Sequence, residues 1–221
     1  MVKEEYTPEK LAEKYDIDLK KLEEEQKKLA KQLQIKNKRD FSESRIAGVF
    51  SVFFENKIIS AVVLCDESLE ILEQAYFQDK IKFPYISGFR AYRELPSLVS
   101  CIDKLEEKPD IIIVNGHGIA HKKLGLASHL SITTGIPTIG VANKLLHGKI
   151  NRGKIEINGK VVGEEFLSRD NARPLYVSPG NLIDLKTALE IVSKTTKFPH
   201  KLPEPLHFAM RYAKKVRKEL S

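Results

Sequence analysis

The chain has 221 residues, of which 42% are hydrophobic and 30% charged, so it can form one sizeable domain and is not a disordered chain. Its formal net charge of +7 favours a polyanionic partner such as DNA or RNA, although a soluble lysine-rich surface has the same excess. The two cysteines have no CxxC spacing and no apolar run reaches the ~20 residues that span a bilayer, which argues against a zinc or membrane protein and indicates a cytoplasmic one.

The N-terminal segment is predicted to be helical and charged. Thr7-Pro8 is a typical helix start, and Asp18 can cap a second helix. After Asp18 the apolar residues fall on one face, and these are Leu19, Leu22, Leu29 and Leu33. The apolar face is too short for a coiled coil. We therefore expect residues 1–40 to form a helical arm packed on a single domain of residues 41–221.

From Ile46 the apolar residues change to a period of two or to continuous runs, which is typical of strands. Residues 46–54, 58–65 and 69–77 are predicted strands, and their connections are short. Three strands joined in this way form an antiparallel meander.

The middle of the chain alternates helices and strands. A loop centred on Pro84 leads into helix 88–106, which is followed by strand 110–114, helix 123–134 and strand 136–141. Gly135 is the expected C-terminal stop of the second helix. Helix–strand alternation predicts parallel strands, because the chain must cross over the sheet between them.

The C-terminal part is predicted to begin with a hairpin over 155–166 that turns at Asn158-Gly159. A short strand at 175–177 and two helices near 184–196 and 204–219 follow. A meander followed by helices and parallel strands is the arrangement of an RNase H-like fold. We therefore expect an α/β protein with a mixed sheet flanked by helices.

The run from Ile111 to His121 is a buried strand that ends in a polar, glycine-rich turn, where α/β proteins place their chemistry. In an RNase H-like fold, acids from the first strand, a helix and the fourth strand hold divalent cations that activate water. By position these residues are Phe50, Glu94 and Asn115. Glu94 is the one acid among them.

Several short motifs in chain order carry a more specific resemblance. They are IAGV at 46–49, FPYI at 83–86, YRE at 92–94, GHGIAH at 116–121, LGLASH at 124–129, IPTIGVA at 136–142, SPG at 178–180 and LPEP at 202–205. In these motifs the chain resembles the endonuclease V family, which cleaves nucleic acid near deaminated adenine (inosine). The resemblance runs from about Ile46 to the last helix.

The resemblance implies Mg²⁺-dependent hydrolysis by an aspartate after Gly-Val on the first strand, the helix glutamate, an aspartate ending the fourth strand, and a histidine or aspartate on the last helix. At these positions the chain has Phe50, Glu94, Asn115 and Met210. The catalytic set of the family is therefore degenerate here, with Glu94 as its remnant.

The physical consequence follows from the side chains themselves. Phe50 offers no ligand atom, and the neutral carbonyl of Asn115 is a weak partner for Mg²⁺. Asp110 begins the same strand as Asn115 but lies roughly 16 Å away from it. We predict no firm metal cofactor, at best weak metal binding at Glu94 and Asn115, and cleavage that is lost or strongly reduced.

A proline-stiffened loop is the first candidate for nucleic-acid binding. The resemblance assigns Pro84, Tyr85 and Ile86 to a wedge that enters the duplex beside the damaged base. An exposed aromatic ring suits this task, because an extruded base leaves a gap in the stack. The residue type fits equally well with a Tyr85 ring that packs on the meander.

The other binding candidates lie near the strand ends. Glycines let backbone amides approach a base or phosphate, and they also form ordinary tight turns: Gly88, Gly116, Gly118 and Gly125. The Ser128 hydroxyl is expected either in such a pocket or capping a turn. The basic candidates are His121, Lys122, Lys123 and Lys144, the last beside Asn143, where the family usually has a lysine. His121 fits equally well as a half-buried imidazole.

These observations leave three functions open. The preferred one is a pseudoenzyme of the endonuclease V family that binds DNA or RNA containing inosine or another deaminated or distorted site, and so acts in nucleic-acid repair. The second is an active Mg²⁺-dependent endonuclease that uses Glu94 with unusual ligands. The third is a non-catalytic interaction subunit that binds a protein partner through the N-terminal arm. The abundance of Lys and Glu without Trp also fits a heat-adapted protein.

Overall fold

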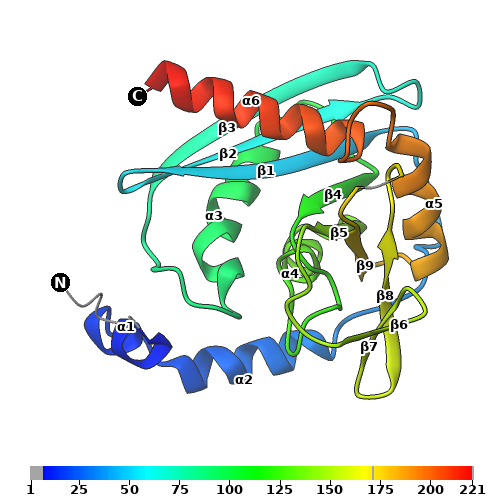
Figure 1. Ribbon diagram of the computed structural model, residues 1–221. Helices are drawn as coiled ribbons and strands as arrows, with labels where there is room; N and C mark the ends of the chain where they lie inside the picture. Colours follow the sequence, from blue (N-terminus) through cyan, green and yellow to red (C-terminus); the bar gives the residue numbers. More distant parts are fainter. Residues whose placement is uncertain (1–6, 171, 221) are drawn as a thin grey trace.

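Antiparallel pairing organises the first three strands of the computed structural model, which describes residues 7–170 and 172–220 (Figure 1). Strands β1 (Ile46–Phe54), β2 (Lys57–Cys65) and β3 (Ile71–Lys80) form the predicted meander. Strand β2 is buried along almost its whole length, because helices cover both faces of the sheet at this point. This part of the prediction is confirmed.

Parallel pairing continues the sheet from β1. Strand β4 (Ile111–Asn115) pairs with β1, and β5 (Thr138–Ala142) pairs with β4, both in parallel. The connections are the helices α3 (Arg90–Ile102) and α4 (Leu126–Thr134). Helix α4 ends at Gly135, whose φ of 71° is the left-handed conformation that glycine adopts without a steric cost. The predicted parallel strands and the mixed sheet flanked by helices are confirmed.

The remaining strands extend the sheet by antiparallel pairing. They are β6 (Lys149–Asn151), β7 (Lys154–Ile157), β8 (Lys160–Phe166) and β9 (Leu175–Asn181), and the full strand order is β3-β2-β1-β4-β5-β9-β8-β7-β6. The predicted turn at Asn158-Gly159 is present with two left-handed residues, as is a second turn at Arg152-Gly153. The sequence analysis missed β6, which is short and exposed, and placed the end of β9 too early.

Helices cover the two faces of the sheet in different pairs (Figure 1). Helices α3 and α4 pack on one face, where they meet Ala47 and Val49 of β1. Helices α5 (Leu185–Thr195) and α6 (Glu204–Leu220) pack on the other, where they meet Ile46 and Phe50. Alternate residues of β1 thus point to opposite layers, as the strand period requires.

The N-terminal arm contains α1 (Pro8–Lys14) and α2 (Leu19–Ala30), which begin at the predicted caps Thr7 and Asp18. Helix α2 runs along the domain beside α4 (Figure 1). Gln26 is fully buried and donates through Nε2 to the carbonyl of Gly88 at 3.1 Å. Tyr92 of α3 donates to the carbonyl of Leu22 at 3.2 Å. The inner side of the arm is therefore bonded to its own domain.

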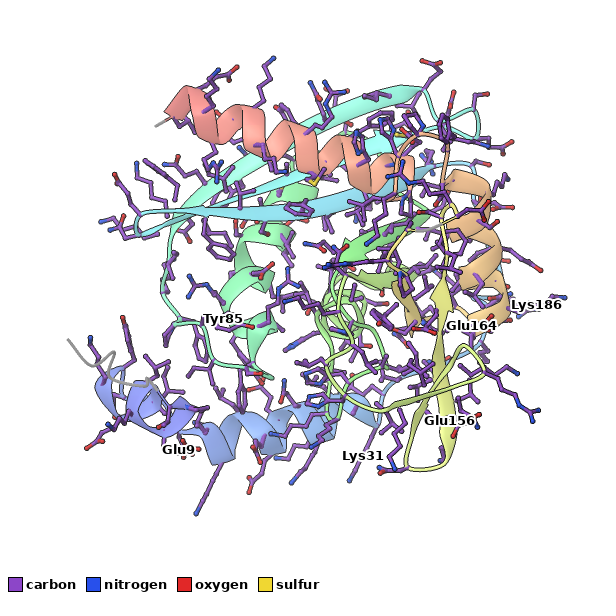
Figure 2. The ribbon with its side chains drawn as sticks, in the orientation of Figure 1. Glu9, Lys31, Tyr85, Glu156, Glu164 and Lys186 are labelled. Atoms are coloured by element: carbon purple, nitrogen blue, oxygen red, sulfur yellow. The ribbon has the colours of Figure 1, made fainter. Side chains whose placement is uncertain are left out.

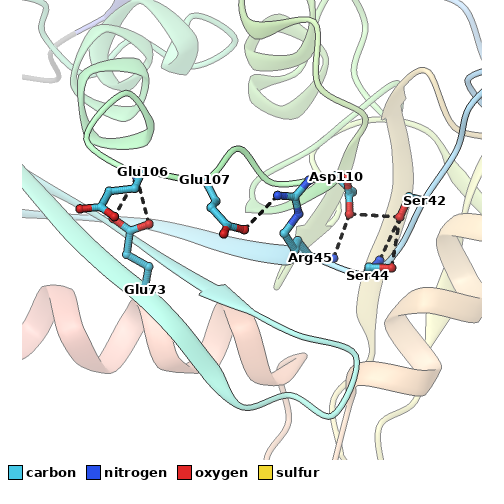
Figure 3. A network of polar contacts seen from close by, with 7 residues as sticks. All are labelled: Ser42, Ser44, Arg45, Glu73, Glu106, Glu107 and Asp110. Atoms are coloured by element: carbon cyan, nitrogen blue, oxygen red, sulfur yellow. Dashed lines mark hydrogen bonds and ion pairs between the residues drawn. The ribbon is translucent and has the colours of Figure 1, made fainter.

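The start of β4 is fixed by an acid–arginine network (Figure 3). Asp110 accepts hydrogen bonds from the backbone N–H of Arg45 at 3.0 Å and from the Ser42 hydroxyl at 3.1 Å. The Arg45 guanidinium also pairs with Glu107 at 2.9 Å. Asp110 therefore stabilises the end of β4 away from Asn115.

Over the described residues, no helix is both long enough and apolar enough to cross a bilayer.

The turn after β4 packs backbone against backbone on β9. The N–H of Gly118 donates to the Ser178 hydroxyl at 3.0 Å, and the N–H of Ile119 donates to the carbonyl of Pro179 at 2.8 Å. A Cβ added to Gly118 would lie 1.9 Å from that carbonyl oxygen. No side chain fits there unless the turn moves away from β9.

The substitution Gly118→Ala is therefore expected to destabilise the protein by about 1–3 kcal/mol, because overpacking forces the backbone to shift. Urea unfolding followed by circular dichroism measures this loss. Gly153→Asn is the matched control, because Gly153 has a left-handed φ of 79° and no atom within 4 Å of an added Cβ. Equal stability of Gly118→Ala and the parent would contradict the packing described.

Candidate nucleic-acid interface

Glu94 is buried in the first half of α3 and is paired with Arg90. One turn of helix separates the two residues, so both side chains lie on the same helix face. The carboxylate accepts from Arg90 through both oxygens: Nε bonds Oε1, and Nη2 bonds Oε2 at 3.0 Å. Glu94 is 2% exposed, so its carboxylate is removed from water, whereas the Arg90 side chain remains 33% exposed. A two-point arginine–carboxylate contact is the strong and rigid form of ion pair.

The third nitrogen of Arg90 reaches the end of β4. Its Nη1 lies 3.4 Å from the point where a Cβ on Gly116 would stand. Gly116 directly follows Asn115, and its N–H donates to the carbonyl of Val141 on β5. The guanidinium therefore fills the space between the start of α3 and the end of β4.

The two apolar replacements lie on the other side of the sheet. Phe50 and Met210 are half-buried and pack on the same hydrophobic cluster beneath α5 and α6. Because Val49 pairs with Val114, the next residues along the strands, Phe50 and Asn115, are neighbours. Asn115 is half-buried at the strand end. Carboxylates at positions 50 and 115 would be adjacent, whereas here an aromatic ring and an amide are.

The donor set does not fit a divalent cation such as Mg²⁺. Both oxygens of Glu94 are engaged by Arg90, and Phe50 and Met210 offer no oxygen ligand. Mg²⁺ requires several oxygen ligands with at least one or two carboxylates. Within residues 7–170 and 172–220, no group of three or more His, Cys, Asp or Glu residues could hold a metal ion.

Another buried acid, Glu204, does not supply the missing carboxylate. It lies in the first turn of α6, is 6% exposed, and bonds Nδ1 of His200 at 2.8 Å. Burial raises the pKa of the Cys65 thiol to about 12, and the negative charges of Asp66 and then Glu204 act in the same direction. Cys65 pairs with Ile46 at the beginning of β1, whereas Phe50 pairs with Ala61 further along the two strands.

A pocket of about 260 Å³ lies beside the Arg90–Glu94 pair. Arg90 and the start of α3 form one wall, and the exposed Lys144 lies in the loop after β5 that forms another. The apolar part of the lining includes Leu126 and Leu146. Tyr85 is 64% exposed at the pocket and lies on the loop before α3, on the side of the N-terminal helices (Figure 2).

Two histidines complete the pocket and are neutral at pH 7. Burial lowers the pKa of His121 to about 4, and the charges of His147, His117 and Lys123 act in the same direction. Burial also lowers the pKa of His117, whose Nε2 bonds the carbonyl of Lys144 at 2.9 Å. The permanent positive charges of the pocket are therefore those of Arg90 and Lys144.

The predicted wedge is only partly exposed. Pro84 and Ile86 are buried, and they hold Tyr85 outward between them. Gly88 follows with a left-handed φ of 84°, and its carbonyl accepts from Gln26 of the arm. The ring of Tyr85 does not pack into the meander, which leaves it available for stacking.

The predicted basic residues differ in their availability. Lys122 is exposed and lines a second hollow with His147 and the β7–β8 turn. Lys123 pairs with Glu23 of α2, and its ammonium lies 4.8 Å from the centre of the Phe89 ring. The charge of Lys123 is therefore used to hold the arm.

Three of the predicted contacts have structural roles. Ser128 is fully buried and donates to the carbonyl of Gly180 at 2.8 Å, so it does not line the pocket. The N–H of Gly118 is bonded to Ser178, and a Cβ on Gly125 would lie 2.2 Å from the carbonyl oxygen of His117. For Gly118 and Gly125 the tight-turn alternative describes the structure, whereas Ser128 neither lines the pocket nor caps a turn but bonds the carbonyl of Gly180 on β9.

Sequence reasoning missed Arg90, His117 and Gln26. The spacing of Arg90 and Glu94 is that of an ion pair on a helix, so this pair was readable once the helix was predicted. His117 lies in a motif that was noted for its glycines. No sequence pattern identifies Gln26, because its role depends on where the arm docks.

Comparisons with known proteins relate the sequence of this chain to one family. A family model described as Endonuclease V matches residues 27–211. Endonuclease V of Dictyoglomus thermophilum is 36% identical over 212 residues, which cover 91% of this chain and 90% of that protein.

Solved structures show the same fold. Endonuclease V from Bacillus subtilis has a TM-score of 0.84 and 27% identity, and the match covers 93% of this chain and 95% of that one. Ciona intestinalis Endonuclease V, in complex with a 24mer DNA containing an inosine followed by a ribo-adenosine, has a TM-score of 0.81 and 22% identity, with 92% and 98% covered. The length of the sequence match and the shared architecture lead to one conclusion: this chain belongs to the Endonuclease V family.

Proposed function

We propose that this chain binds DNA or RNA containing inosine, or another deaminated or distorted site, and that its metal-dependent cleavage is lost or strongly reduced. The observation that carries the proposal is the Arg90–Glu94 pair. It engages the one acid at the site with a positive side chain, where phosphodiester hydrolysis would need a carboxylate-bound cation.

The binding part of the proposal is supported by what remains intact. The outward ring of Tyr85 borders a pocket that contains two permanent positive charges, Arg90 and Lys144. The net charge of the chain is +7, which favours contact with phosphates. The Ciona intestinalis relative, which has the same fold, was crystallised with a DNA that contains inosine.

The loss of cleavage is supported from both sides of the sheet. Phe50 and Met210 form part of an apolar layer, so restoring ligands there would require polar atoms beneath α6. On the opposite side, Glu94 is engaged by Arg90. A cation would have to displace the guanidinium before it could use the glutamate.

A nicking assay tests the proposal directly. The purified protein is incubated with inosine-containing DNA and RNA in Mg²⁺ or Mn²⁺, and binding is measured in parallel with EDTA present. We expect binding without strand scission, because no cation is held at the site. Robust scission that disappears with EDTA and with Glu94→Ala would show instead that the chain is an active nuclease.

Binding should depend on the Tyr85 ring. We expect Tyr85→Ala to weaken binding to an inosine-containing oligonucleotide by about five- to a hundredfold, because base–aromatic stacking contributes roughly 1–3 kcal/mol. Fluorescence anisotropy measures the change. Phe198→Ala is the control, because Phe198 is an 88% exposed aromatic residue in the loop before α6. Equal losses of affinity in Tyr85→Ala and Phe198→Ala would contradict a specific stacking role for Tyr85, because any exposed aromatic ring would then have the same effect.

Restoring the acids should create metal affinity. In Phe50→Asp/Asn115→Asp, two neighbouring carboxylates face the same side of the sheet, which gives a divalent cation the oxygen ligands that it lacks in the parent. Calorimetry with Mg²⁺ and Mn²⁺ should detect binding to this variant alone, with Phe50→Asn as the uncharged control. Tight Mg²⁺ binding at this site in the unaltered protein would contradict our description of it.

A further inference from the structure

We propose that Arg90 is the phosphate-binding group of the pocket, with Glu94 as the residue that positions it. In this arrangement a guanidinium fixed by the protein takes the role of a bound cation and needs no metal. The ligand class is a phosphate ester. The assignment of that phosphate to a nucleic acid rests on the proposed function. Binding of a free nucleotide at Arg90 would not depend on it.

The geometry leaves one end of the guanidinium available. Nε and Nη2 are engaged by the carboxylate of Glu94, while Nη1 lies on the side of Gly116. The Arg90 side chain is 33% exposed and lines the pocket. Because a guanidinium has five N–H donors in a fixed plane, it can bind a carboxylate on one edge and a phosphate oxygen on another.

The charges in the pocket favour an anion. Lys144 contributes a second permanent positive charge from the loop after β5, and the bond from His117 to its carbonyl anchors that loop. Among the residues that line the pocket there is no Asp or Glu. The charged residues of the lining are therefore the cations Arg90 and Lys144, and the carboxylate of Glu94 pairs with Arg90 from outside the lining.

Glu94 makes the cation rigid. An arginine without a partner loses rotational freedom about several side-chain torsions when it binds a ligand, and this loss costs conformational entropy. The two-point contact with a buried carboxylate fixes these torsions in advance. The Nη1 end of the guanidinium lies at van der Waals distance, 3.4 Å, from the position of a Cβ on Gly116.

The test measures affinity for an inosine-containing oligonucleotide over a range of salt concentrations, with EDTA present throughout. The variant Arg90→Met/Glu94→Gln removes both charges, so that no unpaired charge is buried and the protein folds. We expect roughly tenfold to a hundredfold weaker binding, and a salt slope reduced by about one.

Two further variants separate the roles. Glu94→Gln keeps the positive charge of residue 90 and should keep the salt slope. Arg39→Met removes an exposed arginine near the opposite end of β4, where Lys38 and Asp40 line a hollow with Asp110. We expect Arg39→Met to bind as tightly as the parent. A loss in Arg39→Met equal to that in the Arg90 variant would overturn the proposal.

A second experiment titrates inorganic phosphate and inosine 5′-monophosphate into the parent protein and into the double variant Arg90→Met/Glu94→Gln. Arg90-dependent binding of these ligands without oligonucleotide binding would keep the phosphate site and refute the proposed function. Oligonucleotide binding that is identical in the parent and the double variant would refute the phosphate site and keep the proposed function. Failure of every phosphate ligand to bind would refute both.

Discussion

The ion pair between the buried Glu94 and the partly exposed Arg90 is the interaction on which the character of the site depends. A carboxylate out of water must be compensated by a positive charge, and removal of one partner of such a pair typically costs about 3–5 kcal/mol. In a metal-dependent nuclease that charge is a divalent ion. Here it is covalently part of the chain, so the electrostatic demand of the glutamate is met without a ligand from solution.

The topology of the sheet explains why the Arg90–Glu94 pair lies next to one end of β4 and does not involve the polar contacts at the other end. Parallel strands β4 and β5 bring the ends of both strands to one edge, where the loops that follow them meet the start of α3. The opposite end of β4 is held separately by Asp110 and Arg45. The candidate binding site at one end and the structural polar contacts at the other are thus kept apart by a strand of five residues.

Local patterns predicted most of the architecture, because the meander and the Asn158-Gly159 turn depend on residues close in sequence. The helical caps Thr7 and Asp18 were readable for the same reason. The parallel pairing of β1 with β4 joins distant residues and was predicted from the alternation of helices and strands. The site was predicted less completely. Whether Ser128 lines a pocket or bonds a distant carbonyl depends on how β9 packs against α4, and residue type carries no record of that contact.

The bond from Gln26 to Gly88 has a thermodynamic consequence for recognition. It ties helix α2 to the loop that displays Tyr85, while the buried side chains of Pro84 and Ile86 fix the loop from within. A loop preorganised in this way forfeits little entropy when a base stacks on it, so more of the contact energy appears as affinity. The same rigidity limits how far the Tyr85 loop can adjust to rings of different shape or position.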